Sequence, residues 1–327
     1  MGRNGVIGLA ILVGVLGLGW YGVEHREQKA REHTAEVWLP ALQGKTEQVR
    51  AIEITQPGQL HVRLERREQG WLVPAKAGYP VVPGLVEHLL GVLEKARKVE
   101  ARTHNPERLT QLGLAELGAV GQQGTRLSVQ LADGQALMLL IGKPGQHGGQ
   151  LVRMAGDTQS WLIDQHIELP QTELQWLDRR VTQIPFSEVR ELVLEQPRVA
   201  PLVLYRGEGE ASNVQVRDVP PGRRLTHEAA ANSMVLLFAD LRFADAAPLA
   251  QVGFKGEPAL RFRLKTAAGQ ELVGALHQQG EQYWLTLKPG SGLDAQRLPG
   301  KPDWAYRLEA TQYQTLAKKL TDLLVVH

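Results

Sequence analysis

The sequence repeats itself over most of its length. Residues 49–54 read VRAIEI, and a similar VRELVL stands 140 positions later at residues 189–194. The LTQLGL of residues 109–114 returns as LAQVGF at residues 249–254, and RLSVQLADGQ in the first half returns as RFRLKTAAGQ in the second. Self-similarity at a fixed period indicates a structural unit that is present more than once. We therefore expect two related units in tandem.

The hydrophobic periods within each copy indicate both strands and helices. Apolar and polar residues alternate from residue 49 to residue 64, as in half-buried strands, and helical spacing over residues 85–96 follows Pro83. The pair at residues 133–134, Asp-Gly, favours a hairpin turn between two alternating segments. Residues 311–326 are expected to form a closing helix with leucines on one stripe.

We predict an α+β fold, in which one N-terminal transmembrane helix is followed by two tandem, related α+β units with antiparallel sheets. The predicted segments are a membrane anchor at 1–23, a charged stalk at 24–48, a first unit at 49–185 and a second unit at 186–327. A length of 327 residues is consistent with two units, because single domains have about 100–200 residues.

The anchor prediction rests on residues 5–23, which contain no charged side chain. A bilayer core of about 30 Å requires roughly 20 apolar residues, so this segment is long enough to span it. A cleaved signal peptide is the alternative, and the absence of a small-x-small cleavage site disfavours it. The residues expected to matter are Ala10, Gly14 and Gly17 for helix packing in the membrane and Trp20 and Tyr21 for the membrane interface.

Charge and cysteine content exclude several classes of function. There are 37 basic and 35 acidic residues, and no block of Lys and Arg could follow a phosphate backbone, so no nucleic-acid partner is expected. The chain has no cysteine, which excludes disulfides, thiolate metal sites and cysteine nucleophiles.

Few residues show the pattern of a chemical site. The sequence contains no H-E-x-x-H, no G-x-S-x-G and no phosphate-binding loop. His166 and Glu168 form the nearest His–carboxylate pair, but a surface loop is favoured because no third metal ligand is evident. Asp164, Glu173 and Asp178 are interpreted as helix caps rather than as an acid–base pair. We expect no catalytic residues, no metal and no cofactor.

Two further patterns have ordinary structural explanations. Residues 17–22 fit G-x-G-x-x-G, but no strand precedes them, so a dinucleotide site is not expected. Trp71, Trp161 and Trp284 lie in strand-like segments, where burial is more usual than a platform for stacking sugars.

A succession of short motifs resembles the bacterial domain-of-unknown-function 4340 family, most closely over residues 37–245. The motifs that carry the resemblance are Trp38-Leu39-Pro40-x-Leu42, Trp71, Tyr79-Pro80, residues 103–107, Leu112-Gly113-Leu114, Ile141-Gly142, Val152-Arg153, residues 161–164 and Trp176-Leu177-Asp178. The resemblance implies a single-pass protein of the bacterial inner membrane whose bulk is extracytoplasmic, often found beside an ABC-2 type exporter related to the gliding-motility transporter. It implies no catalytic or binding residues.

The expected function is therefore a non-enzymatic accessory or scaffold subunit of such an export complex, with its permease and auxiliary subunits as partners. The charges flanking residues 5–23 do not by themselves decide the orientation in the membrane. The alternative is an envelope binding module that takes up glycan or lipid in a groove between the two repeats. An unrecognised hydrolase is the third and least favoured possibility, because no catalytic motif supports it.

Overall fold

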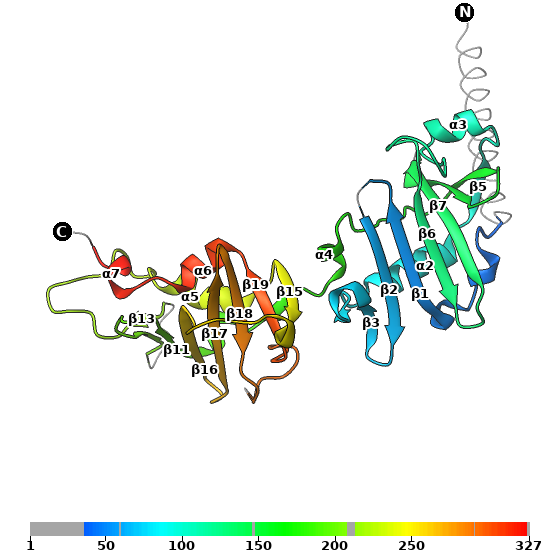
Figure 1. Cartoon of the computed structure of the whole chain (residues 1–327). Coiled ribbons are helices and arrows are strands. Elements are labelled where there is room, and N and C mark those ends of the chain that lie inside the picture. Colours follow the sequence, from blue (N-terminus) through cyan, green and yellow to red (C-terminus); the bar gives the residue numbers. More distant parts are fainter. Residues whose placement is uncertain (1–35, 59, 146–147, 208–212, 291, 326–327) are drawn as a thin grey trace, which may run out of the picture. The chain divides into compact units, whose positions relative to one another are not determined.

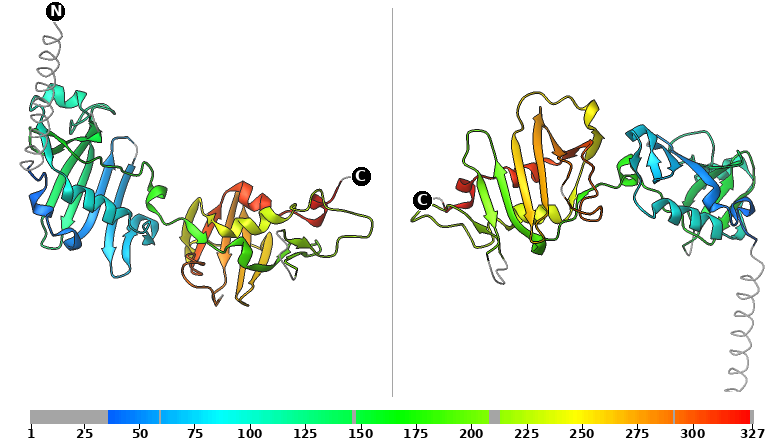
Figure 2. Two further views of the ribbon diagram at one scale, coloured as in Figure 1. Left: turned by 180° about the vertical axis from the view of Figure 1, so that it is seen from behind. Right: turned by 90° about the horizontal axis from the view of Figure 1, so that it is seen from below.

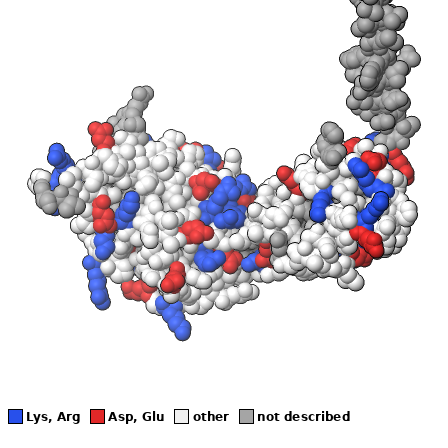
Figure 3. All heavy atoms as spheres, turned by 90° about the horizontal axis from the view of Figure 1, so that it is seen from above, with Lys and Arg blue, Asp and Glu red and all other residues white. Residues whose placement is uncertain are grey.

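The computed structural model describes residues 36–325, except 59, 146–147, 208–212 and 291 (Figure 1). The chain divides into two compact units, the first ending at Trp176 and the second beginning at Leu177. The short segment Ala75–Tyr79 belongs to the second unit. Figure 3 shows basic and acidic side chains interspersed on the face in view.

The first unit is built on a nine-stranded sheet in the order β4-β3-β2-β1-β6-β7-β8-β9-β5. Neighbouring strands from β3 to β5 in this order pair antiparallel. The strands are β1 (Val49–Gln56), β2 (Leu60–Arg67), β3 (Gly70–Val73), β4 (Tyr79–Pro80), β5 (Lys98–Ala101), β6 (Thr125–Leu131), β7 (Ala136–Pro144), β8 (Gln150–Met154) and β9 (Ser160–Ile163). The helices are η1 (Pro40–Leu42), η2 (Thr46–Gln48), α2 (Leu85–Lys95), α3 (Pro106–Gln111) and α4 (Glu173–Trp176), and the short helix η3 (Pro74–Lys76) runs into the segment Ala75–Tyr79.

Helix α2 lies across one face of this sheet, as the left view in Figure 2 shows. Its buried side chains are Val86, Leu89, Leu90 and Leu93, which recur at helical spacing. The central strand β1 alternates, so that Ile52 and Ile54 are fully buried between residues of β2 and β6. The predicted helix and the predicted hairpin between β6 and β7 are thereby confirmed.

The opposite face of the sheet is covered around α3 by a cluster of five buried leucines: Leu109, Leu114, Leu140, Leu151 and Leu162. Strand alternation places Leu140 and Leu151 on the other side from Ile141 and Gln150. Both faces of the sheet are therefore buried where β7, β8 and β9 meet.

The second unit contains an eight-stranded sheet in the order β13-β12-β11-β16-β17-β18-β19-β15, and a separate pair, β10-β14. The strands are β10 (Arg180–Thr182), β11 (Val189–Glu195), β12 (Leu202–Tyr205), β13 (Gln215–Val216), β14 (Leu241–Arg242), β15 (Asp245–Pro248), β16 (Leu260–Thr266), β17 (Glu271–Gln279), β18 (Gln282–Leu287) and β19 (Trp304–Leu308). The helices are η5 (Phe186–Glu188), α5 (Asn232–Leu236), η6 (Leu237–Ala239), η7 (Leu249–Gln251), α6 (Ala310–Leu316) and α7 (Leu320–Leu323). Phe238 of η6 packs against Phe262 of β16, with 5.1 Å between ring centroids.

The two sheets share one strand order. Apart from the additional β4, the order β3-β2-β1-β6-β7-β8-β9-β5 corresponds step by step to β13-β12-β11-β16-β17-β18-β19-β15. The pairing of β1 with β6 shifts register between Val49 and Ala51. The pairing of β11 with β16 shifts at the corresponding place, between Val189 and Glu191. These positions are 140 residues apart, which is the spacing of the sequence repeat.

The predicted fold class is wrong. The described chain is mostly antiparallel β-sheet, and α2, its longest helix, has 11 residues. No helix in the part that the structure describes has both the length and the apolar character needed to cross a membrane. The predicted anchor lies outside the described residues, and so do its named positions Ala10, Gly14, Gly17, Trp20 and Tyr21.

Two segments, the predicted stalk and the predicted closing helix, differ from the prediction for local reasons. Residues 36–48 of the predicted stalk contain only the short helices η1 and η2, and Trp38, Leu39 and Leu42 are buried because they pack into the first unit. The predicted closing helix is divided into α6 and α7. Lys319 takes an extended conformation there, and its N–H donates to the Asp322 carboxylate, which caps a new helix.

Candidate functional site

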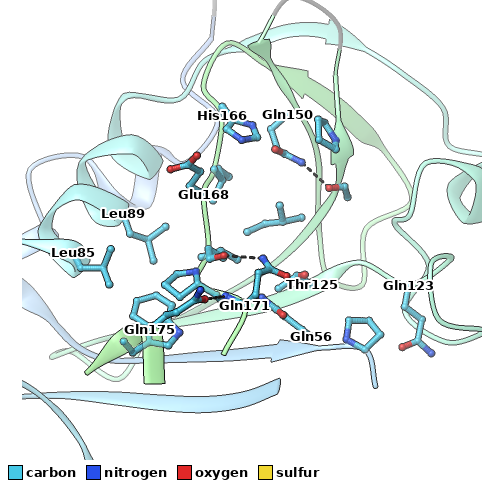
Figure 4. A pocket seen from close by; sticks show the side chains of 18 of the residues that line it. Gln56, Leu85, Leu89, Gln123, Thr125, Gln150, His166, Glu168, Gln171 and Gln175 are labelled. Atoms are coloured by element: carbon cyan, nitrogen blue, oxygen red, sulfur yellow. Dashed lines mark hydrogen bonds between the residues drawn. The ribbon is translucent and has the colours of Figure 1, made fainter. Parts of the chain in front are cut away.

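A cavity of about 770 Å³ lies within the first unit, on the face of the sheet that carries α2. The end of β1, parts of β6 and β7, the start of β8 and the segment that leads into α4 contribute to its walls (Figure 4). Five glutamines are among its lining residues: Gln56, Gln123, Gln150, Gln171 and Gln175. The polar lining is therefore dominated by neutral amide groups.

Gln56 and Gln150 reach the cavity because each occupies a position on the core-facing side of its strand. Gln56 is the last residue of β1 and continues the inward series of Ile52 and Ile54. Gln150 is the first residue of β8 and lies on the opposite side from Leu151. In Figure 4, Gln150 lies beside His166 at one end of the cavity and Gln56 lies at the other.

Both amide groups are held by a hydrogen bond to the backbone. Nε2 of Gln56 donates to the carbonyl of Pro170 at 3.1 Å, and Nε2 of Gln150 donates to the carbonyl of Gly142 at 2.6 Å. Gln56 is 7% exposed and Gln150 is 2% exposed, and the side-chain oxygen of each has no hydrogen-bond partner. The bond from the amide nitrogen fixes the orientation of each group, so each amide oxygen is a buried acceptor without a donor.

Trp176 adds a donor to this arrangement. It is the last residue of α4, it is fully buried, and its indole Nε1–H has no partner. A buried polar group without a hydrogen bond costs about 1–3 kcal/mol, and native structures rarely leave such groups unpaired. Two acceptors and one donor, all on residues that line the same cavity, are therefore buried without a partner.

The remaining lining is apolar inside and polar at the rim. Leu85 and Leu89 of α2 and Ile141 of β7 contribute apolar walls, whereas His166 and Glu168 are exposed. Among the described lining residues there is no Lys or Arg, and Glu168 is the one carboxylate. The site therefore offers no permanently charged cation to balance an anionic ligand.

Two common features of catalytic sites are not seen among the described lining residues. No group of three or more His, Asp or Glu side chains among the described residues could hold a metal ion. Thr125 is the one lining residue with a hydroxyl, and in the described structure no hydrogen bond joins it to His88 or His166 as a catalytic base would require.

The acidic residues considered from the sequence have separate structural roles. Asp164 accepts the backbone N–H of Arg97 at 2.8 Å, and Asp178 forms an ion pair with Arg180 at 2.6 Å. Neither caps a helix, so the cap interpretation is wrong for both, while Glu173 does stand in the first turn of α4. The three carboxylates are not brought together at the cavity.

The strand tryptophans are not among the residues that line the cavity. Trp71 and Trp284 are buried, at 7% and 8% exposure, in agreement with the structural explanation favoured for them. Trp161 is only half-buried, and the ammonium of Lys98 lies 4.6 Å from its ring centroid.

Sequence reasoning missed the glutamines and the role of Trp176. The available signal was a polar residue at a core-facing strand position, which Gln56 provides after Ile52 and Ile54. Its partner Pro170 is 114 residues away in the sequence, so the hydrogen bond itself had no local signal.

Comparison with known proteins gives a family but no described activity. A family model described as "Domain of unknown function (DUF4340)" matches residues 71–255, which is more than half of the chain. No curated protein and no solved structure matches the chain.

Proposed function

Because the chain belongs to the domain-of-unknown-function 4340 family, we propose that it is a non-enzymatic accessory subunit of an ABC-2 type, gliding-motility-like export complex. In this proposal the two sheet units work on the extracytoplasmic side of the bacterial inner membrane and contact the permease and auxiliary subunits. The family resemblance supports the association with an exporter.

The observation that carries the non-enzymatic part of the proposal is the cavity in the first unit. The unpaired polar atoms of its lining residues belong to two anchored amides and an indole, and a threonine provides the lone hydroxyl among the described lining residues. Such a set can hold a molecule by hydrogen bonds but supplies no activated nucleophile.

The test is a pull-down of the tagged full-length chain from native membranes in a gentle detergent, with mass spectrometry of the recovered proteins. We expect a polytopic permease and an ATPase in a fixed ratio to the bait, and neither in the same extract from an untagged strain. Recovery of the chain without these subunits would overturn the proposal.

A second candidate function is an envelope binding module for glycan or lipid. The cavity favours it, although this site lies inside the first unit and not in a groove between the repeats as the sequence analysis expected. Retention of an envelope component by the purified full-length chain, without any export subunit, would support this candidate over the first.

A further inference from the structure

We infer that the cavity of the first unit binds an uncharged sugar through Gln56, Gln150 and Trp176. The inference rests on the second candidate function, that of a binding module, and is independent of membership in an export complex. It commits the site to one chemical class, that of neutral hexoses and N-acetylhexosamines.

Most of the unpaired buried polar atoms belong to residues around this cavity. Among the described residues, five buried side-chain nitrogen or oxygen atoms have no hydrogen-bond partner. Three of them belong to residues that line this cavity, and the other two belong to Trp38 and Arg307. Buried polar groups cost stability when unpaired, so their concentration in one cavity indicates that an occupant pairs with them.

The unpaired atoms need hydrogen bonds of both kinds, donors as well as an acceptor. The oxygens of Gln56 and Gln150 need donors, and the Trp176 indole needs an acceptor. A sugar hydroxyl both donates and accepts, so the several hydroxyls of one sugar can supply donors to the two amides and an acceptor to the indole. A fatty acyl chain would leave these three atoms unpaired, which makes a lipid tail the weaker occupant.

The charge and the size of the cavity also favour a neutral sugar. With no Lys or Arg among the described lining residues, a phosphate or carboxylate would be desolvated without a permanent cation to compensate it. The walls formed by Leu85, Leu89 and Ile141 suit the C–H faces of a sugar ring. A volume of about 770 Å³ falls within the range of ordinary small-molecule sites, about 300–1,000 Å³.

The second unit supplies an internal control. Gln196 stands 140 positions after Gln56, directly after β11, and its Nε2 also donates to a backbone carbonyl, that of Ala317, at 2.8 Å. Gln196 is only half-buried and does not line the cavity. The same substitution at both positions thus removes a similar hydrogen bond, but only at Gln56 does it remove an acceptor from the cavity.

The experiment is a calorimetric titration of the full-length chain in mild detergent with N,N′-diacetylchitobiose and with maltose. Glucose 6-phosphate serves as the charged probe and octanoate as the acyl probe. We expect saturable binding of at least one neutral sugar and no comparable binding of the other two probes. The variants Gln56→Leu and Gln150→Leu should weaken binding about tenfold or more, and Gln196→Leu should leave it unchanged.

A measurement on the unaltered chain protects the test against variants that fail to fold. The indole ¹H–¹⁵N resonance of Trp176, assigned through Trp176→Phe, should move on addition of the sugar. No saturable sugar binding, no movement of this resonance, equal binding of either counter-probe, or an equal loss in Gln196→Leu would each overturn the inference. An export complex recovered without sugar binding would overturn the inference alone, and sugar binding without an export complex would overturn only the first proposed function.

Discussion

Replacing Leu114 with alanine tests side-chain packing on the face of the first sheet that is opposite helix α2. Leu114 is fully buried in the cluster of five leucines, and its side chain lies directly over Gly142 of β7. Large-to-small changes at such positions cost about 2–5 kcal/mol, the sum of lost transfer free energy and a residual cavity. The backbone carbonyl of Leu114, which accepts from Nη2 of Arg153 at 2.8 Å, is retained in the variant. The loss therefore reports side-chain packing.

The assay is thermal unfolding of the full-length chain by calorimetry, with Leu117→Ala as the matched control. Leu117 is three residues further along and 85% exposed, so its truncation should stay within about 0.5 kcal/mol of the unaltered chain. Each kcal/mol lost at Leu114 should lower the melting temperature of the affected transition by about 2–4 °C. Similar melting temperatures for the two variants would refute the assignment of Leu114 to the core.

Three further changes test other parts of the structure. Gly142→Ala should cost about 1–3 kcal/mol, measured by urea unfolding, because an added Cβ would stand 2.6 Å from the carbonyl oxygen of Leu112. The N–H of Gly156 and nearby guanidinium groups lower the pKa of Glu116, so its stabilisation is present at neutral pH and is lost as the pH falls below the usual range for glutamate. As the pH is lowered, the free energy of unfolding should therefore fall less in Glu116→Gln than in the unaltered chain. Burial raises the pKa of Tyr306 to about 12, so stability should fall as the pH rises from about 10 towards 12, and this fall should be smaller in Tyr306→Phe.

Local features of the fold could be predicted because their signals are local. The hairpin turn at Asp133 and Gly134 and the corresponding turn at Gly269 require a left-handed backbone, which glycine adopts without strain. The alternation of β1 and the apolar stripe of α2 likewise come from neighbouring residues. Such signals predict each turn, strand or helix separately.

The prediction of the fold class was wrong because helical spacing was given too much weight in short segments. Most apolar residues lie on strands such as β16, whose side chains alternate strictly between buried and exposed. The segment around Trp38 read as a charged stalk because its upstream neighbours are charged, although Trp38 and Leu42 pack into the sheet unit. Which segment covers a sheet depends on contacts between residues far apart in the chain, and the sequence pattern does not reveal those contacts.

The cavity depends on the segment that comes after β9, which is the last strand of the first unit along the chain. In the second unit α6 begins directly after β19, with Glu309 and Gln312 forming its capping box, and it contacts α5. In the first unit residues 164–172 come after β9 without forming a helix. Pro170 lies in this stretch, where it lacks an N–H and disfavours a helical conformation at the residue before it.

The late start of the helix has a direct consequence for the site. Gln175 Oε1 accepts the backbone N–H groups of Gln171 and Thr172, so the helical turn of α4 forms only beyond the proline. The carbonyl of Pro170 is then available to hold the amide of Gln56, and Trp176 is brought to the cavity at the end of the same turn. A delayed helix in one of two sheets with the same strand order thus accounts for both the space and the polar atoms that line it.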